Sequence, residues 1–582
     1  MTKTSLAAAL SLALLMIPVS HAAKYRVVEL LVADKGQSIF PTAINDGGNI
    51  TVNVSSAFNV PIDLELLDFE SQALIDILTD VDAARNGNIN SVDYEILLAL
   101  IKSADGTQSA QQIASTVSFL ASENETSFIP GFDQLSGPKN EFYFSTTNNV
   151  RDINNSGAIV GSGEGFYNKI NYTFASGENA NFVVHKVGTR AFFSLGNTTV
   201  GLPAPKTIAG GFSEAYGINE NNQVVGYGTS SFISDDIETS ITDCENEELI
   251  DDNDPDTVDF PSRGDIPVES CISGVVSTLS NSVAAFTQLR GLIWQLDAQG
   301  NLLETKELGL LYEPEEEDIA NFSQAFGIND NGVAVGTSSR QYALSNGRQT
   351  ISATQTWGVI FDEDEVINLT LSADDTVIRT NTENSSAVDI NNNNLVVGHK
   401  YRSVNGKTRS KFFVYDMTLG EITFPDDFFL GSSSIATDIN NNGLVVGYGE
   451  VDASLTGRRT EGFLYDTAAD IFYGLRELVG CDSPYTIVQA NSINDSDVIG
   501  ATALYQGPAR DSRGEILLDS SGNEAIVDLV TAVKLEPIIG GEVESCIAQA
   551  DEINKERQGA SVMWLLGFCF VLLGFRRFKS HF

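Results

Sequence analysis

The segment from Asp80 to Asp93 comes nearest, in residue types and spacing, to a metal site in this 582-residue chain. An EF-hand-like calcium loop needs oxygen ligands at alternating positions, a glycine at its sharp turn and a final carboxylate. The oxygen-bearing side chains at matching places are Asp80, Asp82, Asn86, Asn90 and Asp93. Ala84 occupies one ligand position of the standard loop. Asp80 and Asp82 can supply the first ligands only if the loop is two residues longer than that standard. Two readings stay open: a calcium site, or a helix-turn-helix joined by an Asn-Gly turn.

A second acidic stretch lies within residues 232–285. Its carboxylates belong to Asp251, Asp252, Asp254, Asp256 and Asp259. They alternate as in a calcium loop, but no glycine turn or hydrophobic register accompanies them. We therefore expect a solvated acidic loop closed by Cys244 and Cys271.

The sequence contains few residues or motifs that are typical of a catalytic site. The chain has 4 His, with no pair at metal-ligand spacing, and no Gly-x-Ser-x-Gly, Walker or Cys-x-x-Cys motif. No catalytic residue is predicted. A hydrolase that uses two carboxylates stays open, because acids occur throughout the chain.

The net charge limits the partners. With 34 basic and 78 acidic residues, the formal charge is -44. Such a surface repels nucleic acid and acidic lipid, so no nucleic-acid partner is expected. The acidity fits either a soluble exported surface or the collection of divalent cations.

The two chain ends predict export and envelope attachment. Residues 1–22 have a basic start, an apolar run and small residues before Ala22, which is typical of a secretory signal peptide. Residues 559–582 form an apolar segment that ends in Arg576 and Arg577. Its 16 uncharged residues would extend about 24 Å as a helix, which is short for a hydrocarbon core of about 30 Å. The segment is either a C-terminal membrane anchor or a sorting signal that is removed.

Four cysteines lie in the predicted exported body: Cys244, Cys271, Cys481 and Cys546. An oxidising compartment favours disulfides over free thiols. Four cysteines allow three pairings, and the sequence does not choose among them. Proximity along the chain favours Cys244 with Cys271 and Cys481 with Cys546.

A motif built on an Ile-Asn pair recurs seven times and sets the architecture. The asparagines are Asn45, Asn154, Asn219, Asn329, Asn391, Asn440 and Asn494. Three residues further on stand only Gly, Asn or Asp, which tolerate positive φ, so each copy is predicted to be a tight β-hairpin. A glycine then recurs in the second strand of most copies. It implies close approach of another backbone, which an innermost strand near a central axis would explain.

Aromatic-rich strands ending at Asp297, Asp362, Asp416 and Asp466 precede a turn and a further strand. Together with the hairpin, each unit has four short strands, as in a β-propeller blade. The predicted fold is therefore an all-β propeller over residues 23–540, with seven blades, the last completed by both chain ends. An open β-solenoid is the alternative. Residues 60–125, with three helical patterns including residues 110–123, are predicted as a helical insertion, residues 232–285 as an acidic loop insertion, and residues 541–558 as a linker.

The repeat, with its Phe-Leu-Tyr-Asp strand and its Ile-Asn-x-x-Gly-x-Val-Val-Gly hairpin, resembles the HAF-type extracellular repeat of bacteria. The layout of signal peptide, spaced repeats and arginine-ended tail resembles the exported proteins of the DUF3466 family, for which the resemblance implies no known activity. The tail is similar to GlyGly-CTERM sorting signals, although the single Gly559 stands where paired glycines are expected.

We expect an exported, cell-envelope or surface-displayed monomer that acts as a non-catalytic binding or structural module for an unidentified surface partner. Calcium is the only cofactor for which a pattern exists. The alternative is a carboxylate-dependent hydrolase of an extracellular polymer or glycan. Two or three acids in a pocket with aromatic walls would favour the enzyme.

Overall fold

The computed structural model describes residues 24–104, 107–136, 140–250, 260–314, 320–345, 350–369, 384–453, 457–543 and 546. The predicted signal peptide, the C-terminal tail with Gly559, Arg576 and Arg577, and the acidic residues 251–259 lie outside these ranges. Strands make up 47% and helices 13%, so the all-β class is confirmed. No helix in the described part is long and apolar enough to cross a membrane.

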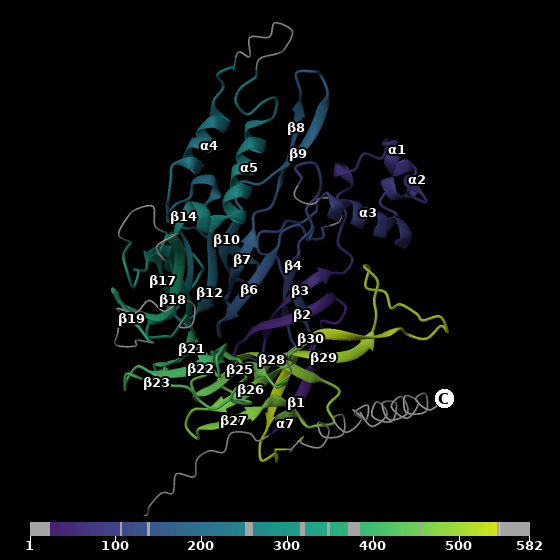
Figure 1. Ribbon diagram of the computed structural model, residues 1–582. Coiled ribbons are helices and arrows are strands. Elements are labelled where there is room, and N and C mark those ends of the chain that lie inside the picture. The colour runs from purple at the N-terminus through teal and green to yellow at the C-terminus, as the bar shows by residue number, and fades with distance from the viewer. Residues whose placement is uncertain are drawn as a thin grey trace, which may run out of the picture.

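Five sheets have four antiparallel strands each (Figure 1). The first has β6 (Asn148–Ile153), β7 (Ile159–Glu164), β10 (Thr189–Leu195) and β11 (Thr198–Leu202); the second β12 (Ser213–Ile218), β13 (Gln223–Phe232), β14 (Thr287–Leu296) and β15 (Leu302–Glu307); the third β16 (Ser323–Ile328), β17 (Ala334–Ser345), β18 (Thr350–Asp362) and β19 (Glu365–Asn368). The fourth has β20 (Ser385–Ile390), β21 (Leu395–Val404), β22 (Lys407–Asp416) and β23 (Glu421–Thr423); the fifth β24 (Ser434–Ile439), β25 (Leu444–Glu450), β26 (Thr460–Asp466) and β27 (Ile471–Gly474). Each sheet is therefore one hairpin followed by two further strands, as the repeat predicts.

The remaining large sheet joins the two ends of the described chain. Its strands are β1 (Lys24–Glu29), β2 (Gly36–Ile44), β3 (Ile50–Ala57), β4 (Thr116–Ala121), β5 (Thr126–Ile129), β28 (Thr486–Ile493), β29 (Ile499–Pro508) and β30 (Ile526–Ile538). It consists of two four-stranded halves, β2 to β5 and β28 to β30 with β1, which meet at one parallel pair, Ser38 with Val530. Strand β1 runs antiparallel to β30 from Lys24–Ile538 to Glu29–Val533. Strands from both ends of the described chain therefore lie in one sheet.

Every Ile-Asn motif ends the first strand of a β-hairpin, and every hairpin has a bulge in that strand. The bulge explains the recurring glycine. A Cβ on Gly447 would lie 2.1 Å from the carbonyl oxygen of Ile435 and 2.9 Å from Cα of Ala436, in the bulged strand beside it. The close approach was predicted, but its cause is the bulge of the same hairpin rather than crowding near an axis.

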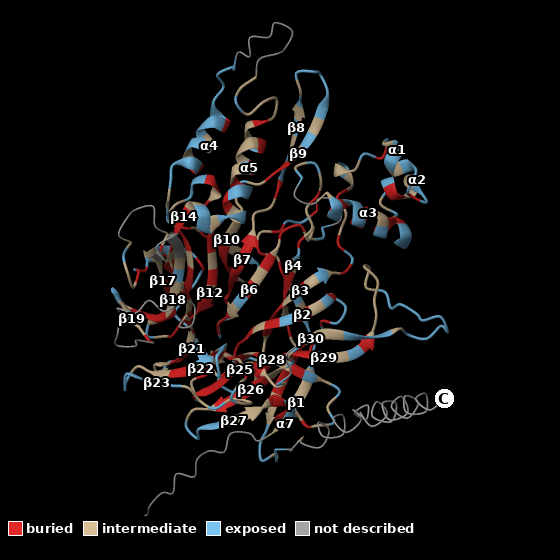
Figure 2. Ribbon diagram, viewed as in Figure 1, coloured by how far each residue is buried: buried red, intermediate tan, exposed pale blue. Residues whose placement is uncertain are grey.

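The core lies between neighbouring sheets, and second strands such as β7 and β25 are buried over four or more consecutive residues (Figure 2). One cluster joins Phe412 of β22 to Ala436 of β24 and Phe463 of β26, so adjacent sheets share one packed layer. Trp294 is fully buried, and its Nε1 donates to the carbonyl of Pro203 at 2.9 Å. Burial of these aromatic strand residues stabilises each sheet only in the presence of its neighbour.

The first insertion follows β3 and contains the short helix η1 (Leu64–Leu66) and helices α1 (Gln72–Ile75), α2 (Val81–Arg85) and α3 (Ser91–Ser103). The helical reading of residues 110–123 was wrong, because β4 occupies residues 116–121. Thr116, Val117 and Phe119 are β-branched or aromatic, and β4 pairs along its whole length with β3. Pairing with β3 therefore outweighs the helical spacing of the apolar residues in this segment.

The second insertion follows β13 and is helical: α4 (Asp236–Glu245), α5 (Val268–Asn281) and α6 (Val283–Phe286). The expectation of a solvated acidic loop was wrong for these residues. Ile237 and Ile241 of α4 pack with Val276 and Leu279 of α5, so the helices bury a common apolar face. In Figure 1, this pair and the hairpin of β8 (Asn168–Thr173) and β9 (Asn179–Val184) project from the same side of the sheets.

Candidate functional site

The seven hairpin turns share one local geometry. In the turn after β24, Oδ1 of Asn440 accepts from the backbone N–H of Asn442 and Leu444 at 3.1 and 2.9 Å. The residue three places after Asn440, Gly443, has a φ of 80°. Positive φ occurs at this place in all seven turns, at Gly48, Gly157, Asn222, Gly332, Asn394, Gly443 and Asp497. The predicted turn geometry is confirmed.

The turn asparagines also bind one another across sheets. In each turn the Asn side-chain Nδ2 donates to the backbone carbonyl of the next turn's Asn, at 2.9 to 3.3 Å. The series runs from Asn45 through Asn154, Asn219, Asn329, Asn391, Asn440 and Asn494, and Asn494 donates back to Asn45. We call these seven residues the Asn ring. All are at most 6% exposed, so each bond is shielded from water.

A second series involves the residue after each ring asparagine. Its backbone N–H donates to the side-chain oxygen of its counterpart in the next turn, at 2.8 to 3.0 Å, and this series also returns to its start. We call these residues the outer ring: Asp46, Asn155, Glu220, Asp330, Asn392, Asn441 and Asp495. Together with the preceding isoleucines and the Asn ring residues other than Asn154, they line a cavity of about 260 Å³.

The outer ring gathers four carboxylates in one place. Three of them accept an amide Nδ2 from a neighbouring asparagine: Asp46 from Asn155, Asp330 from Asn392 and Asp495 from Asn441, at 2.7 to 2.8 Å. The fourth, Glu220, accepts the backbone N–H of Asn155 at 2.9 Å. Burial, and then the charges of the other three acids, raise the pKa of Glu220. The site therefore holds negative charge under mutual repulsion, which neutral amides relieve in part.

Three further carboxylates lie two residues before ring asparagines. Asp152 and Asp438 each accept the isoleucine N–H of the next sheet's turn, from Ile218 at 2.9 Å and from Ile493 at 2.7 Å. Burial raises the pKa of Asp152 to about 7. Burial, the charge of Asp389 and a carboxyl–carboxylate hydrogen bond with it raise the pKa of Asp438. Burial also raises the pKa of Asp389, so both carboxyls of this pair favour the protonated form more than an exposed aspartate does.

An aromatic cluster surrounds the bulge residues of neighbouring first strands. The Tyr216 ring contacts Phe326 at 5.1 Å between centroids and lies under Arg151 at 4.7 Å. Glu214 accepts from the hydroxyls of Tyr216 and Tyr227, at 3.0 and 2.8 Å. One carboxylate thus stands among several aromatic rings.

Four of the five predicted calcium ligands make side-chain hydrogen bonds within the segment. Asp80 caps α2 by accepting from Ala83 N at 2.9 Å, and Asn90 caps α3 by accepting from Asp93 N. The buried Asp93 carboxylate accepts from Thr79 N and Oγ1, Asp80 N and Asn90 Nδ2. Asn86 donates to the carbonyl of Asp82. These hydrogen bonds give the segment a capping role, and calcium binding stays a prediction.

Metal-site geometry is limited elsewhere as well. No group of three or more His, Cys, Asp or Glu able to hold a metal ion occurs among the described residues. The cysteines form the two disulfides that proximity favours, Cys244–Cys271 and Cys481–Cys546, each with a Cα–Cα distance of 5.6 Å. Disulfides are compatible with an exported protein.

The sequence reading missed both the outer ring and the buried aspartates. A signal was present, because the residue after every Ile-Asn pair is Asp, Glu or Asn. Turn preference accounts equally well for that pattern. Only the pairing of turns from different sheets shows that the side chains meet.

The seven equivalent hairpin turns, the Asn ring and the repeated four-stranded sheets together define an all-β repeat protein. The model of the family "Protein of unknown function (DUF3466)" matches residues 3–578, so the chain belongs to this family. A comparison with curated proteins finds no match. Among solved structures, the chain is similar to a puromycin-hydrolyzing peptidase of Mycobacterium tuberculosis, with 8% identity and a TM-score of 0.23. The alignment covers 84% of this chain and 62% of the peptidase, and a likeness this weak carries no argument.

Proposed function

We propose that this protein is an exported β-propeller of seven blades that serves as a non-catalytic binding or structural module at the cell envelope. Three features support the architecture: seven equivalent hairpins, two hydrogen-bond series that return from the seventh turn to the first, and the pairing of β1 with β30. Four-stranded units arranged around an axis avoid the long exposed edges that make open sheets aggregate. The HAF-type repeat would be the unit of each blade.

One observation carries the binding role: the seven units are alike at one end and differ at the other. The turns after the first strands gather around the Asn ring, so the far ends of the second strands all lie away from it. The connections that begin there differ in every unit: residues 58–115, 165–188, 233–286, 346–349, 405–406, 451–459 and 509–525. Variable loops on a repeated rigid scaffold are the usual place for recognition. We call this end the variable face.

Around the Asn ring and the Tyr216 cluster, the placement of acids and aromatic rings favours binding over catalysis. The outer-ring cavity has four carboxylates, but its lining contains no aromatic residue among those described. The aromatic cluster around Tyr216 has one close carboxylate, Glu214. Neither place combines two acids with aromatic walls, which is what carbohydrate hydrolysis would need.

Two observations support the hydrolase alternative. A cavity of about 710 Å³ is lined by four carboxylates and three aromatic rings, among them Asp426, Asp470 and Tyr465. The buried carboxyls of Asp389 and Asp438 also lie next to each other. Carboxyl pairs of this kind serve as acid and base in some enzymes. Here Asp389 accepts the backbone N–H of Ile439, and Asp438 accepts that of Ile493. Hydrogen bonding between sheets therefore accounts for the position of both carboxyls.

A glycan-binding screen combined with a reducing-end assay tests the proposal. The expected result is retention of a glycan or envelope polymer without release of new reducing ends. Product release that is lost in Asp389→Asn would contradict the proposal and establish the hydrolase.

Export and tail processing are proposed from the two termini. Mass spectrometry of the mature protein from cells should show a chain that begins at Ala23. A C-terminus at or near Gly559, with or without attached lipid, would support a sorting signal, whereas an intact tail through Phe582 would leave the membrane-anchor reading. A mature chain that still begins at Met1 would contradict export.

A further inference from the structure

A basic surface interrupts this acidic protein on the variable face of two adjacent sheets. Residues 399–412 and 457–460 contain seven of the chain's 34 Lys and Arg residues and no Asp or Glu. The first segment is the β21–β22 hairpin, and the second lies in the connection between β25 and β26.

The hairpin presents its cations on a single face. In the ladder, Lys400 lies opposite Lys411, and Arg402 lies opposite Arg409, with no shift of register. Directly opposite residues point to the same face, as do residues two apart on one strand, at a spacing of about 7 Å. Like charges placed opposite each other destabilise a hairpin unless counter-charges are near.

Lys411 and Arg402 show how two of these cations are held within the protein. Asp427 accepts two hydrogen bonds from Lys411 Nζ, at 2.7 and 3.0 Å, and is almost fully buried. Arg402 lies over the ring of Phe424 at 4.4 Å, which provides no formal charge. Lys407 is exposed at the end of the hairpin.

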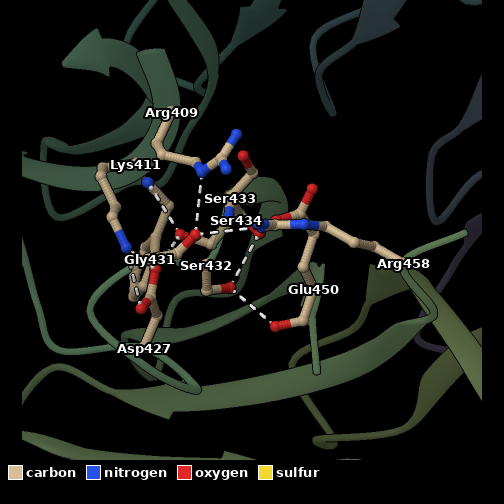
Figure 3. Close-up of polar contacts among 10 residues, drawn as sticks. Arg409, Lys411, Asp427, Gly431, Ser432, Ser433, Ser434, Glu450 and Arg458 are labelled. Carbon is tan, nitrogen blue, oxygen red and sulfur yellow. Dashed lines mark hydrogen bonds and ion pairs between the residues drawn. The ribbon is translucent and has the colours of Figure 1, made fainter. Parts of the chain in front are cut away.

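Two guanidinium groups, one from the β21–β22 hairpin and one from the β25–β26 connection, meet at one backbone oxygen. Arg409 Nε and Arg458 Nη1 both donate to the carbonyl of Gly431, at 2.9 and 3.1 Å (Figure 3). Arg458 also pairs with Glu450, which in turn accepts from the backbone N–H of Ser433. This bonding connects the hairpin to the next unit and fixes the arginines in place.

A cavity of about 460 Å³ continues from Arg458. Its lining includes three arginines, Arg458, Arg459 and Arg476, and a single carboxylate, Glu461. Glu461 accepts the backbone N–H of Arg476 at 3.2 Å, and burial raises its pKa. Tyr485 and the Cys481 end of a disulfide complete the rim. The volume lies within the range of small-ligand sites.

We propose that this surface binds an anionic polysaccharide, with one acidic sugar in the Arg458–Arg459–Arg476 cavity and the polymer continuing across the β21–β22 hairpin. The proposal deepens the proposed binding function by naming the ligand class of the variable face. Guanidinium groups bind carboxylate and sulfate with two parallel hydrogen bonds.

The aromatic residues favour a glycan over a single-stranded nucleic acid. Single-strand binders stack bases on exposed aromatic rings. Here Phe424 is covered by Arg402, and Tyr401 lies on the opposite face of the hairpin.

Binding of the mature protein to polygalacturonate, dextran sulfate and neutral dextran, measured by isothermal titration calorimetry at about 50 mM salt, tests the proposal. The first two probes separate carboxylate from sulfate recognition. We expect binding to at least one anionic polymer, none to neutral dextran, and weakening with added salt. Arg459→Gln with Arg476→Gln should reduce the affinity at least tenfold, and Lys407→Glu should reduce it further.

The matched control is Lys102→Gln with Lys186→Gln, two exposed lysines on insertions of other sheets, which should change the affinity less than twofold. The proposal fails if the wild type binds neither anionic polymer, if control and cavity variants lose affinity equally, or if oligo-dT binds more tightly than both. Unchanged melting temperatures exclude misfolding of the variants. Release of reducing ends from a bound polymer would overturn the non-catalytic function and leave this site standing. Retention of neutral glycans alone would support the binding function and overturn this site.

Discussion

At the scale of single residues, the ring asparagine has three tasks. Its side-chain oxygen closes its own turn, its amide nitrogen bonds the next turn, and its backbone carbonyl accepts the previous one. Only a short amide can donate and accept at once in so small a space. Asn440 illustrates the point, because it is 4% exposed and its Nδ2 reaches both Asn494 O and Asp497 Oδ1 at 2.9 Å.

Asn440→Ala should therefore lower the free energy of unfolding by about 2–3 kcal/mol, since the buried N–H of Leu444 and the carbonyl of Asn494 lose partners. Urea denaturation measures the change. Asn393→Ala is the control, because this exposed side chain donates a single bond, to Asn441 O, and its loss should cost less than about 1 kcal/mol. Equal losses would show that the ring bonds contribute nothing beyond a surface contact.

The buried aspartates predict a pH dependence. A carboxyl whose pKa is raised on folding stabilises the protein while it is protonated, and this contribution is lost as pH rises from the unfolded value of 3.8 through the folded pKa. Asp438→Asn removes that loss and keeps a donor for Asp389. The melting temperature of the variant, relative to wild type, should therefore be higher at pH 8 than at pH 5. Asp364→Asn, at a side chain 96% exposed, should give a flat difference, and a flat difference for Asp438→Asn would refute the assignment.

At the scale of elements, the repeated hairpins could be predicted correctly from the sequence, whereas the segments that occur only once could not. The seven hairpins and their positive-φ positions followed from sequence, because the same local chemistry recurs in each copy. Helix α4 did not, because its acidic residues suggested solvent while Ile237, Ile241 and Cys244, at spacings of four and three, formed the apolar face. Acidic residues in a first turn favour a helix as well as a loop.

The disulfide between α4 and α5 should stabilise this insertion alone. Replacing Cys244 and Cys271 by Ser should speed proteolysis within residues 246–266, because the helix pair has a small core of its own. The β-sheets should keep their melting temperature within a few degrees. The same replacement at Cys481 and Cys546 is the comparison and should leave cleavage at residues 246–266 unchanged. A collapse of the whole fold in the Cys244 variant would show that the insertion is part of the main core.

At the scale of the whole molecule, the contacts that join distant parts of the chain could be predicted only in outline. The sequence indicates that β1 and β30 need partners, but the series of bonds from Asn494 to Asn45, across 449 residues, depends on every intervening sheet having the same shape. The outer ring could not be predicted for the same reason, because its members meet only when all seven turns assemble. The basic surface was hidden by the net charge, since local clustering of cations has little effect on a total of -44.

The central claim is that seven equivalent units form a ring that the two chain ends complete. A crystal structure of the exported body tests it most directly. The account predicts seven four-stranded sheets around one axis, with Asn494 Nδ2 bonded to Asn45 O and β1 paired to β30. An open array of sheets, with Asn45 and Asn494 far apart and β1 detached from β30, would contradict it.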